Sequence, residues 1–396
     1  MPIRSDSPRP AAPIALVGAR VLDTDANVLS GPAVVVLRDG LIDEVREGAA
    51  SAPAGTDAVD VTGRVLMPGL IDAHVHVTQA GTHAEIHDWD SSYHVARSAR
   101  EMEHMLRRGF TTVRDMGGAE TGLARAVEER LFTGPRLLAG GPIFSPTGGH
   151  GLTHIVDGEV ELRKALRAQF RDGADHIKLT VSGGVIAKMR IEALGFSEEE
   201  LRAAVDEARL AKRYIGAHAY TAEAVNRALS LGVRTIEHGT YLDDESIRLL
   251  TELEDVHLVP TLVALWGMLQ GESRGTIGDD ARQSVQDLFE VGLQTLKTAD
   301  SAGVSIGFGT DLHGSGQRLQ LEEIRIRARV QTPEAILRSL TTVGADIVRR
   351  ADRIGRVAPG YDADLLLVDT DPRVDLDAVA DATRSRLVIT AGEIVD

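Results

Sequence analysis

A repeated alternation of short apolar strands with longer amphipathic helices constrains the fold of this sequence most. It begins at Met67-Pro68-Gly69 and continues to about Arg350. The expected strands are Leu70–Ala73, Thr111–Arg114, Arg136–Ala139, His176–Leu179, Ile215–Ala217, Thr235–Ile236, His257–Pro260 and Ser305–Phe308. The expected helices include Val95–Arg108, Ala119–Phe132, Glu159–Asp172, Ser197–Lys212, Ala222–Leu231, Asp243–Leu253, Ser284–Ser301 and Thr332–Arg350. Eight such units predict an α/β fold of the (β/α)8 barrel type. A doubly wound open sheet is the alternative, but no G-x-G-x-x-G motif follows the first strand.

Two helix starts carry capping signals. Ser197 is followed three residues later by Glu200, which is the pattern of a capping box. Thr332 precedes Pro333, and proline is favoured at the first position of a helix. These signals predict that helices begin just after Ser197 and Thr332.

Both ends of the chain have the texture of β structure. Apolar runs separated by turn residues occupy Ile14–Val21, Ala33–Leu37 and Val59–Val61, and the pattern returns at Asp364–Asp369 and Arg386–Thr390. The length of 396 residues also exceeds that of one ordinary domain. We therefore predict a small β-sandwich domain, built from residues 1–66 and 351–396, beside a barrel of residues 67–350. Residues 1–13 are predicted to form a loose tail.

Composition excludes several classes of function. The net charge of −16 argues against binding to nucleic acid or to an anionic membrane. The chain has no cysteine, so thiolate metal sites and cysteine nucleophiles are excluded, and any metal must be bound by nitrogen and oxygen. No apolar run approaches the roughly 20 residues of a membrane span, and the N-terminus has no apolar signal segment. A cytoplasmic protein is the expectation.

Histidines follow several of the predicted strands. His74 and His76 come directly after the first, and alternate residues of a strand point to the same side, so both imidazoles can bind one metal ion. His218 follows the fifth strand and His238 the sixth. Each histidine alone is more often a packing or hydrogen-bonding residue. Their shared position at the carboxyl ends of barrel strands, where active sites of this fold lie, favours a metal site.

Asp311 and Lys178 complete the candidate ligand set. Asp311 ends the eighth strand unit. Alone it is slightly more typical of a turn or a helix cap, but beside four histidines it is placed to bind metal and to accept a proton from water. Lys178 lies within an apolar strand, and a lysine is seldom buried unpaired. It is either paired with an acid, or its amine has reacted with carbon dioxide to form an anionic carbamate that bridges two ions, since a charged ammonium has no acceptor.

These residues, in this order, resemble the amidohydrolase superfamily of binuclear metal enzymes, and the resemblance covers nearly the whole chain. It implies that His74, His76 and Asp311 hold one divalent ion, that His218 and His238 hold a second, and that carboxylated Lys178 bridges them. The family's metal is usually zinc. The resemblance also implies a homo-oligomer.

A narrower resemblance is to the subgroup of Xaa-Pro dipeptidases and related amidohydrolases, which includes relatives acting on ochratoxin and phenylureas. It rests on residues 111–118, 147–150, 182–184, 217–221 and 235–239. Imidazolonepropionase is related, but it is usually mononuclear and lacks the bridging lysine. The subgroup implies that His150 and Tyr220 contact the substrate, although each has a packing role as its alternative.

Three further features bear on the substrate. A structural role is favoured for Arg114, and Arg190 is a second candidate for a substrate carboxylate. The segment Val185–Glu192 departs from the dipeptidase pattern, and His313 stands where an apolar residue is commoner.

The resulting hypothesis is hydrolysis of an amide bond in a dipeptide or N-acyl amino acid. A hydroxide bridging the two ions attacks the carbonyl, Asp311 shuttles the proton, and His150 or Tyr220 stabilises the oxyanion. The alternative keeps the site but cleaves a non-peptide amide, cyclic amide, carbamate, urea or ester. A non-catalytic binding protein on the same scaffold is the remote alternative.

Overall fold

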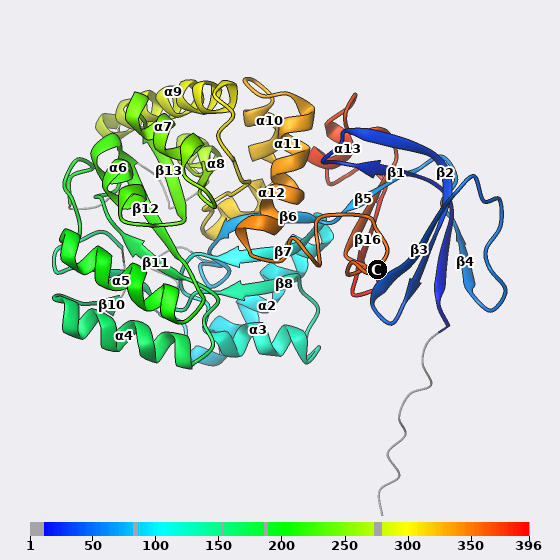
Figure 1. Ribbon diagram of the computed structural model, residues 1–396, viewed down its shortest axis with the longest axis horizontal. Coiled ribbons are helices and arrows are strands. Elements are labelled where there is room, and N and C mark those ends of the chain that lie inside the picture. Colours follow the sequence, from blue (N-terminus) through cyan, green and yellow to red (C-terminus); the bar gives the residue numbers. More distant parts are fainter. Residues whose placement is uncertain are drawn as a thin grey trace, which may run out of the picture.

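The computed structural model describes residues 12–81, 86, 88–151, 154–185, 189–272 and 279–395, with the side chains of residues 279 and 280 left aside. Parallel strands occupy its middle, and helices flank them (Figure 1). Three of these strands form one sheet in the order β6-β7-β8: β6 (Leu70–Val75), β7 (Phe110–Asp115) and β8 (Arg136–Ala139). Six form another in the order β10-β9-β11-β12-β13-β14: β10 (His154–Ile155), β9 (Ile143–Ser145), β11 (Ile177–Thr180), β12 (Ile215–Thr221), β13 (Thr235–Tyr241) and β14 (His257–Val259).

Backbone hydrogen bonds connect the three-stranded sheet to the segments on either side of it. The Asp175 amide donates to the Ala139 carbonyl at 3.0 Å, next to β8, and the Ala73 amide of β6 donates to the Phe308 carbonyl at 2.8 Å. This α/β arrangement of parallel strands is consistent with a TIM barrel.

The predicted eighth and third strands differ in extent from the strands in the structure. The expected eighth strand is reduced to a parallel bridge between Ile306 and Leu258. A Cβ at Gly309 would lie 2.8 Å from the His74 Cβ, so this segment packs directly against His74. The third strand continues beyond Ala139 as β9, after an interruption at Gly141, whose φ is +73°.

The expected helices occur with shifted ends and with one break, and four described helices, over residues 262–269, 314–319, 322–327 and 377–380, were not expected. They are α2 (Ser91–Arg107), α3 (Thr121–Glu128), α4 (Glu159–Arg171), α5 (Glu198–Leu210), α6 (Ala222–Ser230), α7 (Asp244–Glu252), α8 (Leu262–Leu269), α9 (Asp279–Ser301), η1 (Gly314–Leu319), α10 (Glu322–Arg327), α11 (Pro333–Leu340), α12 (Thr342–Ile347) and α13 (Asp377–Ala380). The Ser197–Glu200 capping box and the Thr332 N-cap are both present. The single helix predicted over Thr332–Arg350 is wrong, because Thr341 leaves helical geometry (φ −130°, ψ −90°) and separates α11 from α12.

Strands from both chain ends lie in one further sheet. Its order is β17-β16-β15-β5-β1-β2-β3, with β4 paired to β1. The strands are β1 (Ile14–Asp23), β2 (Val28–Arg38), β3 (Leu41–Glu47), β4 (Asp57–Asp60), β5 (Val65–Pro68), β15 (Leu365–Val368), β16 (Arg386–Thr390) and β17 (Glu393–Val395). β5 and β15 pair antiparallel, which joins the two ends. The two-layer sandwich and the domain boundaries stay predictions.

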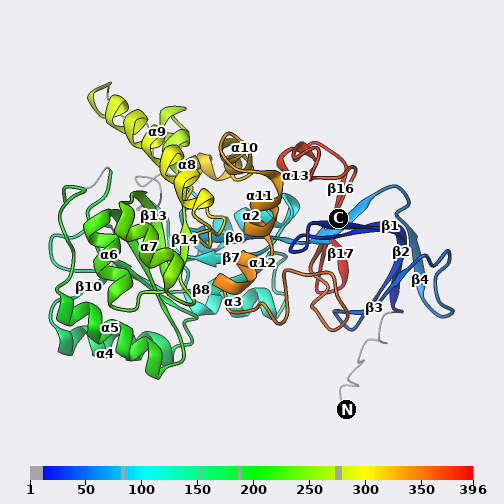
Figure 2. The same cartoon turned by 45° about the horizontal axis from the view of Figure 1, so that its top comes forward.

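The terminal sheet lies at one end of the molecule, and α4 and α5 lie at the other, in both views (Figure 2). Among the helices that the structure describes, none has the length and apolar character needed to cross a bilayer.

Candidate metal centre

The six predicted ligands lie on parallel strands or at their carboxyl ends, and all are buried. His74 is on β6 and His76 follows it; Lys178, His218 and His238 are on β11, β12 and β13. Asp311 follows the Ile306 bridge. None of the six residues is more than 7% exposed. The fold therefore assembles side chains from distant parts of the sequence at one edge of the strands.

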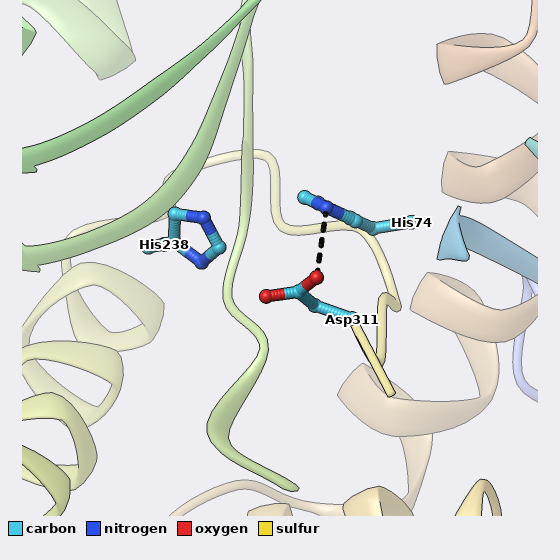
Figure 3. A group of neighbouring side chains, drawn as sticks. All are labelled: His74, His238 and Asp311. Atoms are coloured by element: carbon cyan, nitrogen blue, oxygen red, sulfur yellow. Dashed lines mark ion pairs between the residues drawn. The ribbon is translucent and has the colours of Figure 1, made fainter. Parts of the chain in front are cut away.

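Asp311 lies among the histidines of the first strand. Its Oδ1 atom is 3.1 Å from His76 Nε2 and 3.7 Å from His74 Nε2. Ligand atoms of His74, His238 and Asp311 all lie within 4.8 Å of one another. Figure 3 shows the Asp311 carboxylate between the two imidazole rings.

The other three predicted ligands adjoin this group. The ring centroids of His218 and His238 are 4.6 Å apart, and those of His74 and His238 are 5.4 Å apart. The charge of Lys178 contributes to lowering the pKa of His74, His218 and His238. The lysine amine is therefore within electrostatic reach of histidines from both predicted ion sites.

Hydrogen bonds fix the orientation of each imidazole. The Nδ1 atoms of His74, His76 and His238 lie 2.7 Å from Glu237 Oε2, the Gly117 carbonyl and Thr261 Oγ1, respectively. His218 instead uses Nε2, at 3.1 Å from the Gly183 carbonyl. When one ring nitrogen donates to a carboxylate or carbonyl, the other carries the lone pair that a metal needs.

Burial favours the neutral form of His74, His218 and His238. It is the largest cause lowering the pKa of His74 to about 4, followed by the Lys178 charge. Burial likewise holds the pKa of His218 and of His238 well below 6.5. Neutral nitrogen donors beside a carboxylate, without any thiolate, form a donor set suited to zinc and similar divalent ions. The residues present therefore fit a metal centre.

Backbone strain occurs at two of these positions. His238 has a φ of +75° and Asp311 a φ of +51°, in the left-handed region that non-glycine residues seldom adopt. Such conformations persist where the surrounding structure holds them, and they concentrate at functional sites.

His150 and Tyr220 also lie beside the ligands. The His150 ring is 4.5 Å from that of His218, and a Cβ at Gly184 would lie only 2.4 Å from the His150 ring. The Tyr220 ring stacks on His238, with centroids 4.8 Å apart and an interplanar angle of 5°. Both side chains are thus near the predicted second ion.

The two arginine candidates lie in different places. Arg114 is fully buried and donates to the Ala73 carbonyl, to Thr235 Oγ1 and to Glu237 Oε1, which agrees with the predicted structural role. Arg190 has an 86% exposed side chain beside Glu192. Residues 186–188 of the divergent segment lie outside the described residues.

Sequence reasoning missed Glu237. It is fully buried, bonds His74 Nδ1 and pairs with Arg114 at 2.8 Å. Its signal was an acid inside a buried strand, directly before His238. Thr261, which bonds His238 from a distant loop, carried no comparable signal.

Comparison with known protein families shows which family the chain belongs to. The model of the Amidohydrolase family matches residues 65–395. The chain belongs to the amidohydrolase family. This amidohydrolase is accordingly a hydrolase, as expected, and the non-catalytic alternative is set aside.

Individual relatives of this amidohydrolase are enzymes of several kinds. Ochratoxinase from Aspergillus niger is 28% identical over 347 residues, covering 79% of this chain and 72% of the relative. A prolidase solved in complex with N-methylphosphonate-L-proline is 37% identical, with a TM-score of 0.92, covering 97% of this chain and 99% of the other. A Xaa-Pro dipeptidase with bound methionine is 25% identical, with a TM-score of 0.87, covering 97% and 100%.

Proposed function

We propose that this amidohydrolase uses two divalent ions, most simply zinc, to hydrolyse the amide bond of a dipeptide or N-acyl amino acid. His74, His76 and Asp311 would hold the first ion, His218 and His238 would hold the second, and a carboxylated Lys178 would be shared between them. The observation that carries the proposal is the burial of all six side chains around one edge of the strands. Several neutral imidazoles gathered around one carboxylate form a nitrogen and oxygen donor set that zinc and similar divalent ions accept.

Ions bound there would lower the pKa of a water molecule and polarise a substrate carbonyl. The Asp311 carboxylate accepts the proton of the attacking water and delivers it to the leaving nitrogen. Tyr220 and His150, on the His238 and His218 side of the site, donate hydrogen bonds to the oxygen that becomes negative. Glu237 holds His74 in the tautomer that keeps Nε2 available.

The similarity to the prolidase with N-methylphosphonate-L-proline favours a substrate with an amide next to an amino-acid carboxylate. The similarity to ochratoxinase, an enzyme named for a substrate other than a dipeptide, keeps the second candidate open. The finer fold proposal is a closed (β/α)8 barrel of residues 67–350, with a β-sandwich of residues 1–66 and 351–396. The cytoplasmic location and the homo-oligomer remain predictions.

The test is an assay of zinc- and bicarbonate-loaded protein against Xaa-Pro dipeptides, other dipeptides, N-acyl amino acids, ureas, lactams and esters. Hydrolysis of dipeptides or N-acyl amino acids with the highest kcat/KM supports the proposal. Activity confined to ureas, lactams or esters would reject the dipeptide and N-acyl amino acid substrates and support the second candidate. No hydrolysis by protein that holds its metal would reject both.

A further inference from the structure

His313 lies at the metal centre but has no place in the ligand set proposed above. It is the N-cap residue of η1, two positions after Asp311. Its side chain is 22% exposed, so it is the most accessible imidazole of this group. The resemblance to the dipeptidase subgroup predicts an apolar residue at this position, where this chain has a histidine.

His313 contacts the same Asp311 oxygen as the proposed ligands His74 and His76. Its Nε2 atom is 3.3 Å from Asp311 Oδ1. That oxygen is also 3.1 Å from His76 Nε2 and 3.7 Å from His74 Nε2. Three imidazole nitrogens therefore surround one oxygen atom.

These distances match those between donors that share one ion. Zinc–nitrogen bonds of about 2.0–2.1 Å place neighbouring donors of one ion about 2.9–3.6 Å apart, at the angles of four- to six-coordinate sites. The 3.3 Å between His313 Nε2 and Asp311 Oδ1 lies in that range; without an ion the two atoms form a hydrogen bond, longer than the roughly 2.7–2.9 Å of a charge-assisted one. Ligand atoms of His76, Asp311 and His313 also lie within 4.8 Å of one another.

The turn that carries His313 is fixed to the strand end that carries His76. The Gly314 amide donates to the Gln79 carbonyl at 2.8 Å. Gln317 Nε2, in η1, donates to the carbonyls of His76 and Gln79 at 3.0 and 2.9 Å. The His76 and His313 rings lie 4.9 Å apart as a result. These backbone and Gln317 bonds fix the turn that carries His313.

We propose that His313 is a further ligand of the first ion. The inference rests on the proposed function, because that function assigns the ion to His74, His76 and Asp311. Asp311 and His313 then form a second pair spaced like His74 and His76. The neutral imidazole is a donor that zinc and other first-row divalent ions accept. With the shared Lys178 counted, five side chains would then hold the first ion and three the second, which makes the first the more firmly held of the two.

The experiment compares the cobalt-loaded and zinc-loaded proteins with two variants, His313→Ala and His313→Asn. X-ray absorption counts imidazole ligands, and a competing chelator measures metal release. We expect one fewer imidazole ligand per chain in both variants. The first ion should leave at least about 10-fold faster, since even outer-sphere partners of a ligand are worth 10–100-fold. His104→Ala, on α2 with a 46% exposed ring, should change neither quantity.

His76→Ala separates failure of this inference from failure of the proposed function. If His76→Ala releases metal while both His313 variants keep the wild-type imidazole count and release rate, His313 only bonds Asp311 or contacts substrate, and the inference is overturned. If His76→Ala also keeps the wild-type metal content and release rate, the proposed ligand set itself is wrong. Circular dichroism of each variant distinguishes lost ligation from lost folding.

Discussion

Glu237 contacts both the proposed ligand His74 and the buried Arg114. Its two carboxylate oxygens contact His74 Nδ1 at 2.7 Å and Arg114 at 2.8 Å, and Thr235 Oγ1 donates to it at 2.6 Å. Burial opposes ionisation, but the Arg114 charge and the His74 bond together hold the pKa of Glu237 well below its usual value. The carboxylate is therefore ionised across the physiological pH range.

Glu237→Gln keeps the shape of the side chain and removes its charge. Arg114 is fully buried, so the variant leaves its guanidinium without a counter-charge. Removing one partner of a buried pair costs about 3–5 kcal/mol, and we expect the free energy of unfolding of the metal-free protein to fall by that amount. Loss of the carboxylate that orients His74 should also weaken metal binding by about 10–100-fold.

The assay pairs denaturant unfolding with chelator competition, and Glu207→Gln is the control. Glu207 is also buried and bonds Arg163 and Arg167, which lie on α4, away from the metal centre. Arg167 is 64% exposed, so solvent screens its charge and the control should lose less stability. It should keep wild-type metal affinity. Unchanged metal affinity in Glu237→Gln, or a stability loss no larger than that of the control, would refute the reasoning.

Three further predictions concern other residues. Asp311→Asn should retain at least part of its metal and lower kcat by at least about 10²-fold, because a positioned proton acceptor contributes 10²–10⁴-fold; near-normal turnover would rule out the proton-shuttle role. Metal-free protein reloaded with zinc should bind the second ion only when bicarbonate is supplied, since an uncarboxylated Lys178 ammonium has no lone pair; equal metal content with and without bicarbonate would contradict this. Burial raises the pKa of Glu323 from 4.5 to about 8, so its stabilising contribution is complete below pH 4.5 and is lost as pH rises toward 8. Glu323→Gln should therefore flatten the fall of unfolding free energy over that interval by up to about 1.4 kcal/mol per pH unit, measured by denaturant unfolding at several pH values.

The strand and helix alternation was predictable because periodicity reports burial directly. Strands such as β7 and β8 occur where their apolar runs placed them. The break at Thr341 was not predictable from helical periodicity. There the Thr341 hydroxyl donates to the Leu337 carbonyl and contacts Thr24 Oγ1, from the other end of the chain, at 2.8 Å. A contact across 317 positions leaves no local pattern in the sequence.

The six ligand candidates were predictable because strand ends converge in a parallel α/β fold. The residues that hydrogen-bond these candidates were only partly predictable. Glu237 could have been found as a buried acid beside a ligand, whereas Thr261 reaches His238 from 23 positions away. His313 was noted as unusual, but only the folded η1 turn brings its ring next to His76.

The central claim is that one buried edge of the strands holds two ions. A crystal of the zinc- and bicarbonate-loaded protein, measured at the zinc absorption edge, tests it most directly. We predict two anomalous peaks about 3.5–4 Å apart, one against His74 and His76 and the other against His218 and His238, with density for a carboxylated Lys178 between them. A single peak, or none, in fully loaded protein would contradict the account.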